Sequence, residues 1–124
     1  HPEEIKQSIL SMRALYADKK LTAIFQPHLY TRTRDFYQEF ADSLSLFDDV
    51  ILTDIYPARE LPIPGVTSQL IADNLKPGVP CTLCQKGEVT DIVRQRSNDI
   101  EILVLLGAGD LETQASTITS ILKG

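Results

Sequence analysis

The chain of 124 residues has no tryptophan, one methionine, two histidines and only two cysteines. Two cysteines in a domain of this size do not make a disulfide framework, so the default compartment is the cytoplasm. No apolar run approaches the roughly 20 residues that a helix needs to cross a bilayer, and we recognise no signal peptide. We therefore expect a cytoplasmic globular protein rather than a disulfide-rich secreted domain or a membrane protein.

Basic residues are outnumbered as well. The chain has 12 lysines and arginines against 17 aspartates and glutamates, which gives a net charge of −5. Such a chain has no overall positive field to hold nucleic acid or an anionic membrane, so we expect neither partner. The cationic cluster of His28, Arg32 and Arg34 is therefore a local feature that differs from the rest of the chain.

Cys81 and Cys84 form a CxxC pair without a second pair or a nearby histidine. Residues three apart on a strand point to opposite faces, so the two thiols are expected to diverge. We interpret both as buried structural cysteines and expect no metal site in the chain.

Apolar periodicity predicts helices and strands that alternate along the chain. Helices are expected over residues 2–16, 31–46, 67–75, 88–96 and 111–123, and strands over residues 21–26, 49–54, 79–85 and 100–107. In the second helix, an apolar stripe is expected from Phe36, Phe40, Leu44 and Phe47. Thr67 or Ser68 is expected to cap the third helix.

Strands that alternate with helices indicate βαβ units and a parallel sheet. The nearly continuous apolar strand over residues 100–107 is typical of a sheet that is buried on both faces. We therefore predict a single domain over residues 1–124, a three-layer α/β/α, Rossmann-like fold with a mostly parallel sheet. In such sheets ligands bind beyond the carboxyl ends of the strands.

The first loop at that edge reads QPHLYTRTR, residues 26–34. It leads into a helix N-terminus, which favours an anion, and Arg32 adds a planar fork suited to a carboxylate or a phosphate. His28 adds a further donor. The alternative is that Arg32 and Arg34 are solvated residues of the first helical turn.

Two further loops reach the same edge. The loop DIYPARE offers Asp54, Tyr56, Arg59 and Glu60, although Tyr56 packing on the sheet and an Arg59–Glu60 pair would explain it too. In GAGD, Gly107 and Gly109 would let a ligand approach the backbone, although a tight turn needs them equally. The chain has no GxGxxG, no GK[ST] and no serine on a strand-to-helix elbow, so we expect no phosphate loop and no catalytic nucleophile.

Four segments occur in a characteristic order, namely HPEEI, FQPHLYTRTRDF, DIYPARE and GAGD. In this order they resemble the C-terminal, amino-acid-binding domain of the UDP-N-acetylmuramate–L-alanine ligases of the Mur ligase family, over essentially the whole chain. Such a ligase has three domains, so the N-terminal and central domains are expected outside this chain. That the chain begins with His1 rather than methionine also suggests part of a longer protein.

The resemblance implies an ATP-dependent ligase that joins L-alanine to UDP-N-acetylmuramate through an acyl phosphate, in bacterial peptidoglycan and cell wall biosynthesis. ATP and Mg²⁺ would be bound mainly by the central domain, so we expect no cofactor in this chain and no activity from it alone. The expected partners are UDP-N-acetylmuramate, L-alanine, ATP and the enzyme's own N-terminal and central domains.

The resemblance also implies site residues. His1, His28 and Arg32 match positions near the alanine carboxylate. The expected lining of the cleft continues with Tyr30, Tyr56, Arg59, Glu60, Gly107, Ala108 and Gly109. The family commonly has arginine where this chain has Leu29, so one carboxylate contact is missing or replaced. We expect Arg34 to face away, leaving His28 and the helix N-terminus as the remaining contacts.

Two other interpretations remain open at this point. One is a stand-alone α/β module that binds a small anion and performs no chemistry. The other is the C-terminal domain of a different muramyl peptide ligase.

Overall fold

The computed structural model describes residues 2–107. Its helices are α1 (Pro2–Leu15), α2 (Tyr30–Leu44), α3 (Ser68–Ala72) and α4 (Val89–Arg96), with a 3-10 turn η1 (Lys86–Glu88) before α4. Its strands are β1 (Leu21–Gln26), β2 (Asp49–Leu52), β3 (Cys81–Leu83) and β4 (Ile102–Gly107).

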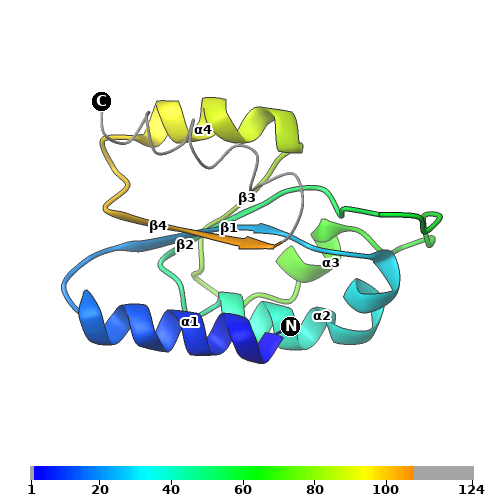
Figure 1. The fold of residues 1–124 in the computed structure, drawn as a ribbon, viewed down its shortest axis with the longest axis horizontal. Helices are drawn as coiled ribbons and strands as arrows, with labels where there is room; N and C mark the ends of the chain where they lie inside the picture. The colour runs from blue at the N-terminus through cyan, green and yellow to red at the C-terminus, as the bar shows by residue number, and fades with distance from the viewer. Residues whose placement is uncertain (1, 108–124) are drawn as a thin grey trace.

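The strands form one four-stranded sheet in the order β3-β2-β1-β4, and all its pairings are parallel. The sheet lies between α4 on one face and α1, α2 and α3 on the other (Figure 1). This confirms the predicted three-layer α/β/α architecture. Because the strands are parallel, the carboxyl ends of β1, β2 and β4 all lie at one edge.

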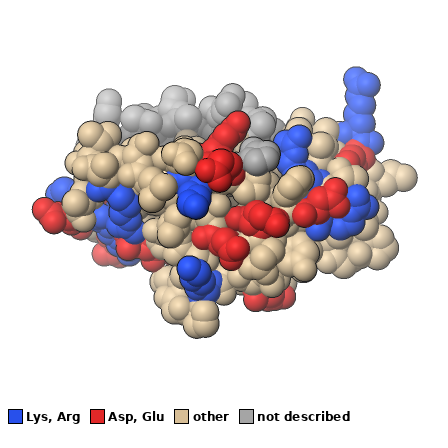
Figure 2. Space-filling view, turned by 90° about the horizontal axis from the view of Figure 1, so that it is seen from below, with Lys and Arg blue, Asp and Glu red and all other residues tan. Residues whose placement is uncertain are grey.

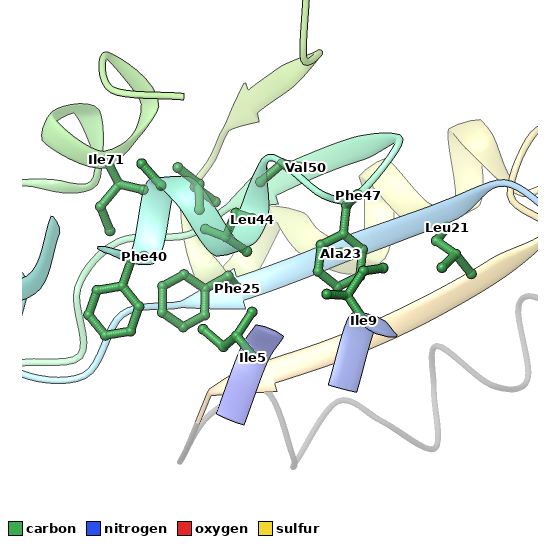
Figure 3. Close-up of a cluster of buried hydrophobic side chains, with 12 residues drawn as sticks. Ile5, Ile9, Leu21, Ala23, Phe25, Phe40, Leu44, Phe47, Val50 and Ile71 are labelled. Carbon is green, nitrogen blue, oxygen red and sulfur yellow. The ribbon is translucent and has the colours of Figure 1, made fainter. Parts of the chain in front are cut away.

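The larger core fills the space between the sheet and α1 and α2. Ile5 and Ile9 are four residues apart on α1; Ile5 lies beside Phe25 of β1, and Ile9 lies beside Ala23 and Phe47 (Figure 3). The Phe25 and Phe40 rings are 5.2 Å apart. Residues four apart share one helix face, so a single stripe of α1 is buried. The buried members are Ile5, Ile9, Leu21, Ala23, Phe25, Phe40, Ala41, Leu44, Phe47, Val50, Leu52 and Ile71.

The smaller core lies on the other face of the sheet, under α4. Ile24 of β1 and Ile51 of β2 pack with Val89 and Val93, which again share one helix face. Side chains alternate along β1, so Leu21, Ala23 and Phe25 join the first core while Ile24 joins the second. β1 is therefore buried along its whole length, as its apolar sequence requires.

The polar faces of α1 and α2 form the outer surface of the larger layer. Figure 2 shows acidic and basic side chains mixed over this face. On α2 the charged and amide groups pair along the helix, for example Gln38 with Asp42 at 2.9 Å. The charge pattern is that of an ordinary solvated surface.

Several predicted details are wrong. Phe36 is 38% exposed, whereas Phe40, Leu44 and Phe47 are buried as predicted. The α-helix has 3.6 residues per turn, so a row of residues four apart winds around the helix and its first member leaves the core face. Thr67 occupies the N-cap position of α3 without a side-chain capping bond, and the Ser68 hydroxyl donates to the Thr53 carbonyl instead.

The strands are also shorter than predicted at their ends. β2 stops at Leu52 rather than at residue 54, and β3 covers three residues. β4 contacts both cores but is only partly buried, because in the described part of the chain it lies at the edge of the sheet. The helix predicted over residues 111–123 lies outside the described residues.

The cysteines point to opposite faces, as predicted. Cys81 packs against the larger core and Cys84 against the smaller one, and both are free and half-buried rather than fully buried. Partial burial, aided by the nearby Asp49, raises the pKa of Cys81 to about 11. Burial likewise raises the pKa of Cys84 to about 11, so both thiols are protonated at neutral pH.

Candidate functional site

A pocket of about 370 Å³ opens at the carboxyl ends of β1 and β4, beside α1 and the first turn of α2. It brings together three residues that the sequence singles out, His28, Arg32 and Gly107. Its full lining is Glu4, Ile5, Ser8, Phe25, Gln26, His28, Arg32, Phe40, Leu105, Leu106 and Gly107. The edge predicted from strand direction therefore does hold a cavity.

His28 is fixed by the loop that follows β2. The N–H of Tyr56 donates to the carbonyl of Pro27, and the N–H of Leu29 donates to the carbonyl of Tyr56, both at 2.8 Å. These bonds form an isolated parallel bridge between His28 and Tyr56, and their rings stack with centroids 5.6 Å apart. One face of the imidazole is thus covered, and its nitrogen-bearing edge remains for a ligand.

Leu29 has a strained backbone, with a φ of 73° that side chains rarely adopt. Its carbonyl accepts hydrogen bonds from the N–H and the hydroxyl of Thr33, at 3.2 and 2.9 Å, and Thr33 is fully buried. The residue is therefore held on both sides, by Tyr56 and by Thr33. Such strain is typical of functional sites.

Glu60 caps α2. Its carboxylate accepts the N–H of Thr31 at 3.0 Å and the hydroxyl of Thr31 at 2.5 Å. These bonds hold the pKa of Glu60 below its ordinary value, against the opposing effect of desolvation. The helix N-terminus that the sequence offers to a ligand anion is thus held by a carboxylate of the chain itself, and Glu60 pairs with Thr31 rather than with Arg59.

Other predicted cleft residues lie elsewhere. Tyr56, Arg59 and Glu60 do not line the 370 Å³ pocket. Tyr30 lines a neighbouring hollow of about 310 Å³. Arg34 faces away, as expected, and forms an ion pair with Asp35 at 2.9 Å.

Three predicted site residues lie outside the described residues, namely His1, Ala108 and Gly109.

Gly107 allows the end of β4 to lie close to the end of β1. It has a φ of 118°, and a Cβ there would lie 2.5 Å from the carbonyl oxygen of Gln26. Such a distance is too short for any real side chain, so only glycine allows β4 to end beside β1. The predicted close approach is therefore to β1 of the same chain.

Sequence reasoning missed the wall supplied by α1. Glu4 and Ser8 line the pocket, four residues apart and next to the buried Ile5. Their spacing places them on one helix face, but only the packing of α1 on β1 brings that face to the site. Gln26 was missed too; it is 2% exposed, and within residues 2–107 its side-chain oxygen has no hydrogen-bond partner.

The pocket combines cationic donors with an apolar lining. The guanidinium of Arg32 and the ring of His28 can donate to a carboxylate. The apolar side chains of Ile5, Phe25 and Leu106 also line the pocket. A small carboxylate with a short apolar side chain suits this lining.

Two searches of the described residues gave no further site. Between residues 2 and 107, no group of three or more His, Cys, Asp or Glu side chains could hold a metal ion. In the same range, every helix is too short or too polar to cross a membrane.

Comparison with known proteins gave consistent results, although no family model matches the chain. The chain is 66% identical over 123 residues to a UDP-N-acetylmuramate–L-alanine ligase of Phocaeicola vulgatus, covering 99% of this chain and 26% of that protein. It is 53% identical to the ligase of the same name from Parabacteroides distasonis, with 98% and 26% covered. The chain thus spans about a quarter of the length of these relatives.

Solved structures share the fold. A UDP-N-acetylmuramate–alanine ligase of Thermotoga maritima matches with a TM-score of 0.72 at 22% identity, over 99% of this chain and 25% of that one. A domain of a putative UDP-N-acetylmuramate:L-alanyl-γ-D-glutamyl-meso-diaminopimelate ligase from Haemophilus ducreyi matches with a TM-score of 0.69 at 19% identity, over 98% and 84%. These two matches show the fold alone, whereas the sequence relatives show that the chain belongs, over the quarter of their length that it spans, to the UDP-N-acetylmuramate–L-alanine ligase family.

Proposed function

We propose that the chain is the C-terminal domain of a cytoplasmic, ATP-dependent ligase that joins L-alanine to UDP-N-acetylmuramate during peptidoglycan synthesis. Its role in the whole enzyme is to bind L-alanine and present it to the activated muramyl carboxylate. Identity of 66% to a ligase of this name supports the assignment. The observation that carries the binding role is the convergence of His28 and Arg32 on one pocket.

In this proposal the alanine carboxylate binds Arg32 and His28, and the amino group points away from these two side chains. A guanidinium holds a carboxylate through two parallel hydrogen bonds, which fixes direction as well as position. The small apolar wall accommodates a methyl side chain. The amino group attacks the acyl carbon as the free amine, so its ammonium proton is first lost to solvent or a base, and collapse of the adduct releases a second proton and phosphate. The contribution that we propose for this domain is the orientation of the amine.

Activation of the muramyl carboxylate as an acyl phosphate would come from ATP and Mg²⁺ bound mainly by the central domain. The chemistry they supply is a good leaving group on the acyl carbon. This division of labour is an expectation from the family resemblance, and the sequence itself contains no GK[ST] phosphate loop. The chain alone is accordingly expected to be inactive.

The test is a pair of substitutions in the full-length enzyme. Arg32→Ala removes a charge-assisted contact worth about 1.5 to 3 kcal/mol, so the KM for alanine should rise about ten- to a hundredfold. The KM for ATP should change little. Arg32→Lys should recover little, because a point charge does not reproduce the planar fork.

Arg34→Ala is the matched control, because Arg34 lies two residues away on the same helix and is paired with Asp35 on the surface. It should change the alanine KM by less than about threefold, as expected of an exposed ion pair. An unchanged alanine KM in Arg32→Ala, or an equal effect of Arg34→Ala, would refute the proposed carboxylate site.

A further inference from the structure

The loop between β2 and α3 is joined to the loop between β1 and α2 by three kinds of contact: backbone hydrogen bonds, a ring stack and side-chain hydrogen bonds. Tyr56 bonds the backbone on both sides of His28, the Tyr56 ring stacks on the His28 ring, and Glu60 bonds Thr31. Tyr56, Thr31 and Glu60 do not line the pocket themselves. Tyr56 holds His28, which does, and Glu60 holds Thr31, the residue before the pocket residue Arg32.

We propose that Glu60 is a positioning residue for the alanine site, and that it acts by fixing the first turn of α2, which presents Arg32. This inference rests on the proposed function of the pocket. Thr31 immediately precedes Arg32, and its N–H and hydroxyl are both bound by one carboxylate at 3.0 and 2.5 Å. With both contacts in place, the backbone that carries Arg32 has one orientation.

The charge of Glu60 matters as well as its geometry. The N-terminus of a helix attracts an anion, and α2 begins close to the pocket. Because the Glu60 carboxylate already occupies that position, it competes with and repels a substrate carboxylate at the N–H groups of the first helical turn. The substrate carboxylate is directed to the side chains of Arg32 and His28, where the amino group can be aligned.

The length of the side chain is a further requirement. Glu60 reaches Thr31 across the gap between two loops, and the hydrogen bonds themselves lower its pKa below the ordinary value. Glu60→Gln keeps the length and an acceptor for the Thr31 N–H but loses the charge. Glu60→Ala loses both contacts, so the two variants separate geometry from charge.

The experiment measures steady-state kinetics of the full-length enzyme for Glu60→Ala and Glu60→Gln, with alanine and with alaninamide, which lacks the carboxylate. Glu60→Ala should raise the alanine KM roughly five- to tenfold, because a misplaced binding group loses much of its effect. It should also reduce the preference for alanine over alaninamide. Glu60→Gln should lie between Glu60→Ala and the unsubstituted enzyme.

The control is Glu88→Ala, because the Glu88 carboxylate also accepts a backbone N–H at the start of a helical segment, that of Gln85 at 2.8 Å, but at η1 and away from the pocket. Glu88→Ala should leave both the alanine KM and the alaninamide preference unchanged. A merely destabilising substitution lowers the amount of active enzyme and therefore the rate with both substrates alike. The preference ratio does not respond to that loss, so it separates positioning from stability.

Two results would overturn the inference. If Arg32→Ala raises the alanine KM while Glu60→Ala leaves KM and preference within twofold, Glu60 serves stability only, and the proposed carboxylate site stands. If neither substitution changes the alanine KM, the carboxylate site itself is wrong, and the positioning role falls with it.

Discussion

Replacing Gly107 by alanine tests whether the end of β4 must approach β1 as closely as the structure has it. The added Cβ would lie 2.5 Å from the Gln26 carbonyl oxygen and 3.2 Å from its nitrogen, and both are backbone atoms that cannot rotate away. Overpacking of this kind costs about 1 to 3 kcal/mol. The φ of 118° adds strain of about 1 to 2 kcal/mol for any side chain.

We therefore expect Gly107→Ala to lower the free energy of unfolding by about 2 to 5 kcal/mol. The chain has no tryptophan, so unfolding in urea is followed by far-ultraviolet circular dichroism, with linear extrapolation to zero denaturant. Because small domains have only about 5 to 15 kcal/mol of stability, a loss of this size is easily measured.

Two other glycines separate the cost of the close Cβ contact from the cost of the backbone strain. Gly78 also has a positive φ, of 90°, but a Cβ there would meet nothing within 4 Å, so Gly78→Ala should cost only the strain, about 1 kcal/mol. Gly87 has neither feature, so Gly87→Ala should be neutral or stabilise by about 0.5 kcal/mol. If Gly107→Ala costs no more than Gly78→Ala, the close contact between β1 and β4 is not real and the reasoning fails.

Three further predictions concern stability and reactivity. Leu29→Gly should raise the free energy of unfolding by about 1 kcal/mol, because it relieves the strain of a φ of 73°; a loss of similar size would contradict this. Cys81 and Cys84 have pKa values of about 11, so native-state alkylation by iodoacetamide at pH 8, followed by mass spectrometry, should be about a hundredfold slower than for a free thiol; equal rates would refute it. Burial acts to raise the pKa of Asp48, but bonds from Arg13 and the Leu21 N–H leave it lowered, so Asp48→Asn should destabilise at neutral pH. The stabilisation from Asp48 is fully present above the unfolded-state pKa of about 3.9 and is lost as pH falls through the lower folded-state pKa. The difference in the free energy of unfolding between the unsubstituted chain and Asp48→Asn should therefore shrink below about pH 4. A difference that stays constant with pH would contradict this prediction.

Local sequence was enough to predict that four strands exist and at which edge of the sheet the 370 Å³ pocket lies. The bounds of β1 follow from six residues suited to a buried strand, closed by Pro27, and they are Leu21–Gln26 as predicted. Parallel pairing then places the carboxyl ends of β1 and β4 at one edge, so His28 and Gly107 line the same pocket. This inference needs only strand direction, which βαβ alternation provides.

What the sequence did not reveal depends on contacts between segments far apart in the chain. Glu60 and Thr31 belong to loops after different strands, and nothing in the spacing of either loop indicates that one caps the helix of the other. Glu4 reaches the pocket only because α1 packs across β1. Phe36 was wrongly predicted to be buried, because a stripe of four apolar residues does not indicate which of its two ends is exposed to solvent.

The position of β1 in the sheet has a consequence for how the protein is made. β1 precedes β4 in the sequence by most of the described residues, yet the two strands are neighbours in the sheet, and Gln26 pairs with Gly107. Within this span a ribosome releases α1, β1, α2 and β2 before β4, and these earlier elements already share the larger core. We expect them to collapse together while the other edge of β1 still lacks a neighbour, exposed until β4 emerges. The 370 Å³ pocket is lined by residues from both ends of this span, so it forms only after β4 has been synthesised, and its assembly depends on the slow long-range pairing of β4 with β1.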